Sequence, residues 1–160
     1  MEYTFKNLDD FDEISDDIVS RYNKLIAQLK GKASDIDTVD LEEVKKRKDS
    51  ELLLFMLDGN SKIIGMAHVS YLCVPVKKVG YINTVVVDEA YRGQGLGALL
   101  MEELQKRARE RWIDIDTFNL TSNPLKGTQG FYLRLGYRMR TKEAGDETIF
   151  YVKDVDGYTR

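Results

Sequence analysis

Three glycines at alternate positions constrain the fold of this chain more than any other feature. Gly93, Gly95 and Gly97 follow the apolar run Tyr81–Val87 and accompany an amphipathic stretch that begins at Leu96. Glycine adopts left-handed backbone conformations without steric cost, so this segment predicts a tight turn from a strand into a helix. One apolar stripe is expected to face the core from that helix, made of Leu99, Leu100, Leu104 and Ala108.

The same turn is suited to binding phosphate. Glycines at alternate positions leave backbone N–H groups exposed at the start of a helix, where the helix dipole adds partial positive charge. Arg92 precedes the first glycine and can add a full positive charge. A pyrophosphate group is therefore a natural ligand, although glycines that only tighten a strand-to-helix turn would leave the same pattern.

Two other phosphate-binding motifs can be compared with this segment. The P-loop pattern Gly-x-x-x-x-Gly-Lys-Ser/Thr occurs nowhere in the chain. The dinucleotide pattern Gly-x-Gly-x-x-Gly/Ala fits residues 93–98, but the chain that follows is too short for the remaining strands of a dinucleotide-binding fold. The acids expected to bind a ribose, Asp114 and Asp116, begin the next strand instead of ending it. A nicotinamide-dependent oxidoreductase is therefore the weaker alternative.

Periodicity and turn residues divide the rest of the chain into strands and helices. We expect strands at 1–6, 52–57, 62–72, 81–87, 113–120 and 148–152, and helices at 14–29, 40–48, from 96 onward, and at 130–135. Asp58, Gly59 and Asn60 form the hairpin turn between the second and third strands. This order of elements predicts a mixed sheet with helices packed on it.

Composition limits the class of protein and its partners. A length of 160 residues with 42% hydrophobic side chains suits one domain over residues 1–160, and we expect the end from residue 153 to be a flexible tail. With 24 basic and 27 acidic residues, no general attraction to nucleic acid or to an anionic membrane is expected. The single Cys73 cannot form an internal disulfide, and the chain shows no signal-peptide or membrane-span pattern, which predicts the cytoplasm. One histidine, one cysteine and scattered acids give no metal-ligand spacing, so no metal is expected.

Residues 85–97 resemble the acetyl-CoA motif of the GCN5-related N-acetyltransferases (GNAT), whose core is Gln/Arg-x-x-Gly-x-Gly/Ala. Arg92, Gly95 and Gly97 fill the defining positions. Residues 120–124 and 131–137 resemble the later strand of the same family, its asparagine, and its Phe-Tyr-x-x-x-Gly-Phe/Tyr element. The resemblance implies an α/β (α+β) fold, with a mixed, mostly antiparallel sheet of six to seven strands flanked by about four helices.

The resemblance implies an N-acetyltransferase that uses acetyl-CoA as a co-substrate and acetylates a primary amine by direct attack, through a tetrahedral intermediate. A small-molecule amine is the first expectation for the acceptor, and a protein amino group is the second. An acyl-CoA-binding sensor or inactive relative is an alternative from another class. Because relatives often dimerise, a homodimer is a further expectation.

The resemblance also gives individual residues a role. Backbone groups of the turn would bind the pyrophosphate beside Arg92, namely those of Gly93, Gln94, Gly95, Leu96, Gly97 and Ala98. The pantetheine arm and the thioester carbonyl would contact the backbone of Val85, Val86 and Val87, where family members carry a bulge that frees backbone groups. Asn123 and Lys126 would also hold the cofactor, although Asn123 suits a turn cap and Lys126 a solvated position equally.

Tyr132 matches the tyrosine that the family uses as general acid toward the departing thiolate, in contact with the cofactor. A phenol with a pKa of about 10 can donate a proton to a thiolate whose conjugate acid has a pKa of about 8.5. Aromatic packing beside Phe131 and Tyr137 is the alternative role for this side chain.

The sequence does not identify the base that activates the amine. Many relatives carry a glutamate at the position of Asn83, and an amide cannot accept the proton. Three alternatives remain: another carboxylate such as Glu51 or an acid of the first helices, a water molecule held by Asn83, or an amine that is already neutral. His68, the only histidine, titrates in a useful range, but a single strand histidine is often a bystander. The family usually shapes its acceptor site from the first two helices and the strand ends, here residues 22–48 and 71–78.

Overall fold

A seven-stranded sheet forms the centre of the computed structural model, which describes residues 2–31, 40–122, 129–140 and 149–155. The strand order is β1-β2-β3-β4-β5-β7-β6. The strands are β1 (Thr4–Asn7), β2 (Glu51–Leu57), β3 (Ile63–Val74), β4 (Lys77–Val87), β5 (Thr117–Ser122), β6 (Arg138–Met139) and β7 (Ile149–Asp154). All neighbours are antiparallel except β4 and β5, which run parallel. The expected mixed, mostly antiparallel sheet is confirmed.

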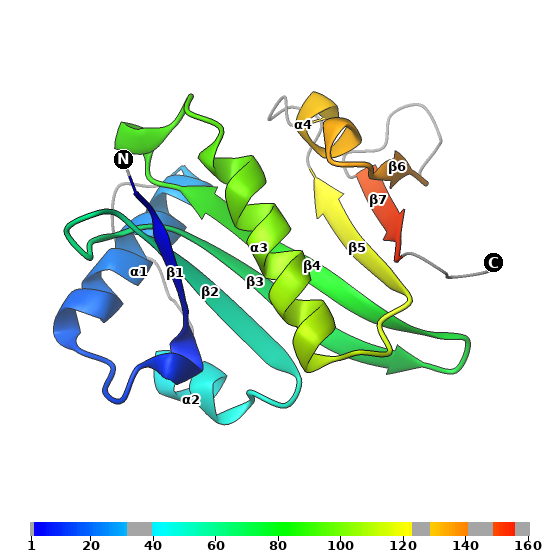
Figure 1. Cartoon of the computed structure of the whole chain (residues 1–160), viewed down its shortest axis with the longest axis horizontal. Helices are drawn as coiled ribbons and strands as arrows, with labels where there is room; N and C mark the ends of the chain where they lie inside the picture. The colour runs from blue at the N-terminus through cyan, green and yellow to red at the C-terminus, as the bar shows by residue number, and fades with distance from the viewer. Residues whose placement is uncertain (1, 32–39, 123–128, 141–148, 156–160) are drawn as a thin grey trace.

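Helices cover both faces of this sheet (Figure 1). The described helices are α1 (Asp16–Lys30), α2 (Leu41–Lys46), α3 (Leu96–Arg111) and α4 (Gln129–Arg134), with short 3-10 turns at Leu8–Asp10 and Glu89–Tyr91. Helix α1 begins as its sequence predicts, because the Ser15 hydroxyl accepts a hydrogen bond from the Ile18 N–H at 3.3 Å. It ends at Gly31, whose φ of +70° is a left-handed conformation that glycine tolerates.

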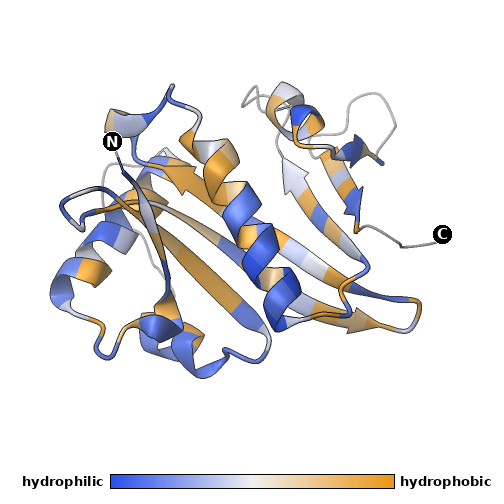
Figure 2. Cartoon of the chain, in the orientation of Figure 1, coloured by the Kyte–Doolittle hydropathy of each residue, from blue (hydrophilic) through white to orange (hydrophobic). Residues whose placement is uncertain are grey.

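The core forms two layers because β2 is apolar on both of its faces (Figure 2). Leu52, Leu54 and Met56 pack with α3, whereas Leu53, Phe55 and Leu57 pack with α1 and α2. Successive strand residues point to opposite faces, so a continuous apolar run requires cover on both sides. The helices α1, α2 and α3 supply that cover.

Several element boundaries differ from those expected. Strand β4 begins at Lys77, four residues early, because β3 and β4 form one long hairpin. Strand β5 begins at Thr117 instead of Ile113, which is 94% exposed in the turn after α3. Leu99 is 46% exposed and does not belong to the core stripe of α3, which runs through Leu96, Leu100, Met101, Leu104 and Ala108. Strand β6 was not expected, and β7 continues through Lys153 to Asp154, where a flexible tail was expected.

Candidate active site

The carboxylate of Asp88 fixes the chain where β4 ends and the glycine turn begins. It accepts hydrogen bonds from Arg21 Nη2 at 2.6 Å and from the Ala90 N–H at 3.1 Å, and Gln28 Nε2 lies 3.4 Å away. Burial alone would raise the pKa of Asp88, but these donors outweigh burial and hold the pKa below its usual value. The approach to the turn is thereby anchored to α1.

Gly93 and Gly95 give the turn its shape. Their φ angles are +81° and +76°, in the left-handed region that side chains disfavour, and no atom lies within 4 Å of the place a Cβ would occupy on either residue. Gly95 is the N-cap of α3 and, having no side chain, makes no capping hydrogen bond to this end of the helix. The first N–H groups of α3 therefore receive no side-chain acceptor from their cap residue, which suits them to an anion.

Gly97 has a different role from the other two glycines. A Cβ on Gly97 would lie 3.3 Å from Cζ of Phe131, so the absence of a side chain lets α4 pack closely against the start of α3. Leu96 is buried in the core, which leaves only its backbone available to a ligand. The turn and the Phe131–Tyr137 element of the sequence are thus neighbours in space.

Arg92 and Gln94 are exposed residues whose side chains brace the turn. Arg92 Nε donates to the carbonyl of Val87 at 2.9 Å, and Gln94 Nε2 donates to the carbonyl of Tyr91 at 3.2 Å. The hydroxyl of Tyr3 lies 3.4 Å from Gln94 Oε1. The guanidinium of Arg92 is therefore held beside the end of β4, where its charge adds to the positive end of α3.

Strands β4 and β5 separate directly before this turn (Figure 1). Their pairing ends at Ile82 and Leu120. Beyond that point β5 continues its pairing with β7, and β4 with β3. The register between β3 and β4 shifts at the same place, because His68 and Val69 pair with Thr84 and Ile82, so that Asn83 is the extra residue of a β-bulge. The gap between the two strands thus opens at Asn83.

The bulge leaves backbone groups of β4 directed toward the gap. The Asp88 N–H donates to the carbonyl of Ile64 in β3 at 2.8 Å. Because alternate residues of a strand turn their backbone groups to opposite sides, Val86 also faces β3, whereas Val85 and Val87 face away from it. Of the three valines predicted to contact the cofactor, Val85 and Val87 therefore offer backbone groups to the gap, and Arg92 already occupies the carbonyl of Val87.

Tyr132 lies on α4 within an aromatic cluster. Its ring contacts those of Phe131, Tyr137 and Tyr151, with centroids 5.1, 6.1 and 5.3 Å away. Burial, and secondarily the neighbouring Tyr151, raises the pKa of Tyr132. Val85 packs against the same core cluster as Tyr132. The side chain thus packs as an aromatic residue, and its phenol is protonated at neutral pH.

A polar cluster lies on β2, β3 and β4, on the face of the sheet that α1 and α2 cover. It consists of Glu51, His68, Ser70 and Asn83. His68 Nε2 lies 2.7 Å from Glu51 Oε2, and His68 Nδ1 lies 2.5 Å from Asn83 Oδ1. The Ser70 hydroxyl donates to Glu51 Oε2 at 2.6 Å and lies 3.3 Å from Asn83 Nδ2. The three residues considered separately from the sequence as candidates for the amine side thus form one network.

Ser70 is the member of this cluster that the sequence analysis missed. The signal was available, because His68 and Ser70 are two residues apart and alternate with the buried apolar Val69. Strand alternation places both side chains on one face. The pairing of Glu51 with Ser70 and of His68 with Thr84 then brings β2 and β4 residues to the same place.

The polar cluster borders a cavity of about 190 Å³, which we call the α2 cavity. Its lining residues are Glu43, Val44 and Arg47 of α2 and its C-terminal end, and Glu51, His68 and Ser70 of the sheet. The side chains of His68 and Glu51 are 18% and 22% exposed, so solvent or a small ligand reaches them from this side. The α2 side of the cavity lies within residues 22–48, one of the two regions expected to shape an acceptor site, whereas its sheet side lies outside both regions.

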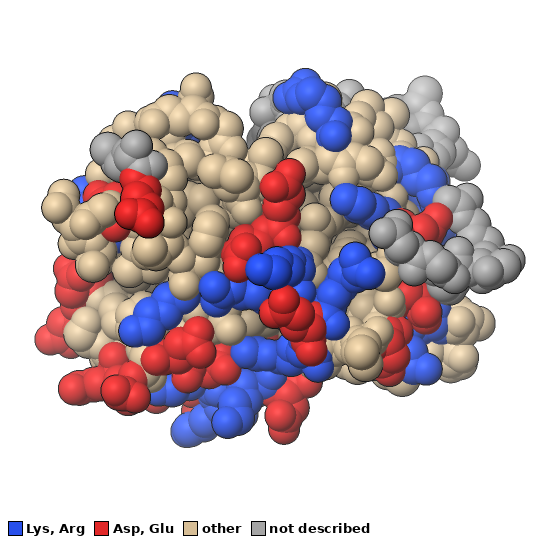
Figure 3. Space-filling view, in the orientation of Figure 1, with Lys and Arg blue, Asp and Glu red and all other residues tan. Residues whose placement is uncertain are grey.

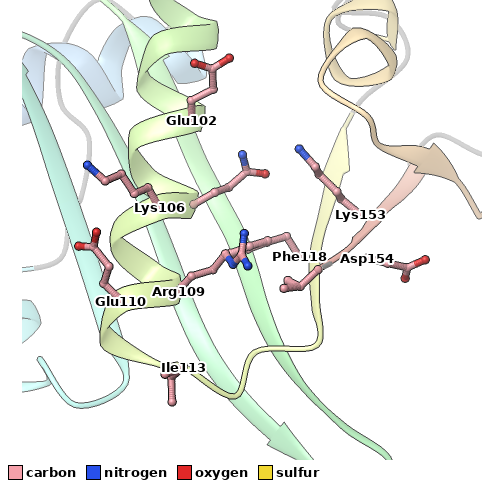
Figure 4. Close-up of a pocket in the computed structure, with 10 residues that line it drawn as sticks. Glu102, Lys106, Arg109, Glu110, Ile113, Phe118, Lys153 and Asp154 are labelled. Atoms are coloured by element: carbon pink, nitrogen blue, oxygen red, sulfur yellow. The ribbon is translucent and has the colours of Figure 1, made fainter. Parts of the chain in front are cut away.

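A larger cavity of about 640 Å³ lies between α3 and the strands β5 and β7 (Figure 4). Its lining includes Glu102, Lys106, Arg109 and Glu110 of α3 and Lys153 and Asp154 of β7. Arg109 and Lys153 point into the space between α3 and β7, whereas Lys106 and Glu110 point to the other side of α3. Phe118 lines it where β5 is hydrogen-bonded to β4, with the ring directly over Gly80. The sheet is closed at that level, and both charge signs are interspersed over α3 (Figure 3). This cavity thus borders the part of the sheet where β4 and β5 are paired.

Two predicted cofactor contacts, Asn123 and Lys126, lie outside the described residues. Within the described ranges, no group of three or more His, Cys, Asp or Glu side chains is placed to hold a metal ion. None of the helices in these ranges has the length and apolar composition needed to cross a membrane.

Sequence comparison connects this geometry to known proteins. A model of the acetyltransferase (GNAT) family matches residues 17–137. An uncharacterized N-acetyltransferase of Chlorobaculum tepidum is 30% identical over 96 residues, which cover 60% of this chain and 56% of that protein. The chain thus spans little more than half of that relative. The glucosamine 6-phosphate N-acetyltransferase of Trypanosoma brucei brucei is 25% identical over 115 residues, covering 69% of this chain and 74% of that protein.

Solved structures share the fold. An acetyltransferase crystal structure from Trypanosoma brucei superimposes with a TM-score of 0.68 and 25% identity, covering 89% of this chain and 96% of that one. The glucosamine-6-phosphate N-acetyltransferase of Arabidopsis thaliana gives a TM-score of 0.70 at 21% identity, covering 91% and 98%. The second likeness concerns the fold alone.

Proposed function

The chain belongs to the GNAT acetyltransferase family, and from this premise we propose that it transfers an acetyl group from acetyl-CoA to a primary amine of a small molecule. The observation that carries the proposal is the β4–β5 gap, which opens beside the N-terminus of α3, where the cap residue Gly95 offers no side chain. A nucleotide-linked thioester needs N–H donors for its pyrophosphate and free backbone groups for its amide-containing arm. Consecutive elements of this chain offer both.

In this proposal the turn and β4 divide the binding of acetyl-CoA between them. The first N–H groups of α3 and the Arg92 guanidinium receive the pyrophosphate, which open space above Gly93 and Gly95 supports. The backbone of Val85 faces the gap and pairs with the pantetheine arm or the thioester carbonyl. Asn123 and Lys126 complete the cofactor contacts, as the family resemblance implies.

The reaction proposed is direct attack of a neutral amine on the thioester carbonyl. A C–N bond forms, and a backbone N–H at the bulge stabilises the oxyanion of the tetrahedral intermediate. Collapse of the intermediate breaks the C–S bond. The attacking nitrogen loses one proton to solvent, the Tyr132 hydroxyl donates its proton to the departing thiolate, and the phenolate is reprotonated from solvent. A phenol is protonated at neutral pH, so the Tyr132 hydroxyl carries the proton that this role requires.

The acceptor proposed is a small amine. In this proposal the protein acts in the cytoplasm as a monomer or homodimer, and it needs no nucleic acid, membrane or metal. One relative is named for glucosamine 6-phosphate, so this amino sugar heads the test panel, followed by glucosamine, spermidine, amino acids and a lysine peptide. Release of CoA thiol together with acetylated amine is expected with at least one acceptor. Acetylation of the peptide alone would favour a protein substrate, and acetyl-CoA binding without any product would favour a sensor.

A further inference from the structure

We propose that Glu51 and His68 are positioning residues, which hold the β-bulge of β4 through the side chain of Asn83 and thereby direct the backbone of Val85 toward the β4–β5 gap. This inference rests on the proposed acetyl transfer, in which Val85 pairs with the pantetheine arm or the thioester carbonyl. It assigns the polar cluster to the geometry of the cofactor site, and not to proton transfer from the amine.

Strand pairing leaves Asn83 unheld. In the register of β3 against β4, Asn83 is the extra residue of the bulge, and the pairing of β4 with β5 ends one residue earlier, at Ile82. The extra residue of a bulge stays outside the ladder, so the ladder on either side does not determine its orientation. Hydrogen bonds of the Asn83 side chain are therefore the means by which this residue can be held.

The polar cluster supplies a partner at each end of the Asn83 carboxamide. Oδ1 lies 2.5 Å from His68 Nδ1, and Nδ2 lies 3.3 Å from the Ser70 hydroxyl. Glu51 Oε2 closes the ring, at 2.7 Å from His68 Nε2 and 2.6 Å from the Ser70 hydroxyl. Contacts at both ends fix the plane of the carboxamide. Four side chains from three strands thus hold the bulge residue in one orientation.

His68 is a link in this ring of contacts. One ring nitrogen contacts Glu51 and the other contacts Asn83, so neither nitrogen is free for an acceptor amine. The side chains of His68 and Glu51 are 18% and 22% exposed, which shields their contact from most of the solvent. A carboxylate on one nitrogen of an imidazole fixes the orientation of the ring. Glu51 therefore acts on Asn83 through His68.

The cluster reaches the gap only through the backbone of β4. His68 pairs with Leu53, which packs with α1 and α2, whereas Val85 packs on the opposite face, with α3 and Tyr132. Val85 follows Asn83 by two residues, so a rotation of the bulge residue changes the direction of the Val85 N–H and C=O. A displacement of about 1 Å in a positioned group can lower a reaction rate about 100-fold. A small rotation at the bulge is therefore sufficient to impair acetyl transfer.

Amide NMR of 15N-labelled protein tests this linkage without any ligand. Glu51 lies on β2, two strands from Val85 on β4, so removal of its carboxylate has no direct effect on the Val85 amide. We expect Glu51→Ala to shift the Val85 amide resonance, and to shift it no further when Asn83→Ala is already present. The control is Thr117→Val, which removes a hydrogen bond to Asn119 Oδ1, of 3.0 Å, at the closed end of the sheet. It should leave the Val85 resonance in place.

Release of CoA thiol measures the consequence for acetyl transfer, with hydroxylamine and with the best acceptor of the panel. Glu51→Ala should lower kcat at least about tenfold with both acceptors alike, because the thioester is misplaced whichever nucleophile attacks it. In the Asn83→Ala background the same change should lower kcat by less than about twofold, since the two residues act as one unit. Calorimetric titration should show an unchanged affinity for acetyl-CoA, because the pyrophosphate binds at the glycine turn. Thr117→Val should retain the wild-type kcat.

Three results would overturn the inference. They are a Val85 amide that stays in place in Glu51→Ala, losses of kcat that multiply in the double variant, and a loss of kcat confined to the best acceptor, which would assign the cluster to the amine. Failure of the proposed function has a different signature. The wild-type protein would then release no CoA thiol even with hydroxylamine, while the NMR comparison would still decide whether the cluster holds the bulge.

Discussion

Replacing Gly95 by alanine tests the glycine turn against a control within the same chain. Gly31, at the end of α1, has a φ of +70° where Gly95 has +76°, and neither residue has an atom within 4 Å of a built Cβ. Gly31→Ala and Gly95→Ala therefore impose the same backbone strain and no steric clash. They differ in what occupies the open space, because only Gly95 precedes the helix end proposed to bind pyrophosphate.

The strain of a left-handed alanine costs about 1–2 kcal/mol, offset in part by the lower entropy of the unfolded chain. Each variant should thus lose about 1 kcal/mol of unfolding free energy, or about 2–4 °C in Tm. In Gly95→Ala the added methyl group would occupy the space that we propose for the phosphate oxygens. We expect the affinity for acetyl-CoA to fall at least about tenfold, equivalent to about 1.4 kcal/mol.

Thermal unfolding and calorimetric titration with acetyl-CoA measure the two effects separately. We expect Gly31→Ala and Gly95→Ala to lose the same amount of Tm, and only Gly95→Ala to lose affinity for acetyl-CoA. Equal affinities in the two variants, within twofold, would refute the assignment of the pyrophosphate to this turn.

Three other substitutions probe the mechanism and the fold. Tyr132→Phe should lower kcat about 100-fold or more at unchanged acetyl-CoA affinity, and an unaltered kcat would exclude Tyr132 as the general acid. Gly80→Ala should cost about 1–3 kcal/mol in urea titrations, because its Cβ would lie 2.7 Å from the ring of Phe118. The control Gly59→Ala meets nothing closer than 4.0 Å and should cost less, so equal costs would contradict the packing argument. The pKa of Asp88 is lower when folded, so its stabilisation is present above about pH 4 and is lost as pH falls through the folded-state pKa. Asp88→Asn should reduce the loss of unfolding free energy at acid pH. An unchanged loss would mean that groups other than Asp88 cause it.

Features set by neighbouring residues along the chain were predictable from the sequence. The glycine turn follows from local backbone chemistry, and the apolar run at residues 52–57 indicated the strand β2. The same local reasoning places the Asp58 turn between β2 and β3, where Asp58 Oδ1 accepts from the Asn60 and Lys62 N–H groups.

Features set by pairing between distant segments were not predictable in this way. The bulge at Asn83 arises from the register of β3 against β4, which the sequence of β4 alone does not specify. The proximity of Glu51, His68 and Asn83 depends on that register across three strands. Each residue could be suspected individually, but their hydrogen-bonded cluster could not.

Packing also changed the interpretation of single residues. Gly97 matches the phosphate-binding pattern, yet its missing side chain makes room for the ring of Phe131. Leu99 matches the apolar stripe by residue type, but the helix turns it toward solvent because the stripe is centred on Leu100 and Leu104. A sequence pattern thus predicts the chemistry of a residue more securely than it predicts which residues that residue contacts.

A crystal structure of the protein with CoA would show whether the glycine turn and the β4–β5 gap bind acetyl-CoA. We expect the pyrophosphate at the first N–H groups of α3, beside Arg92, and the pantetheine arm along Val85 with its sulfur facing Tyr132. Density for CoA in the cavity between α3 and β7, with the β4–β5 gap empty, would contradict it.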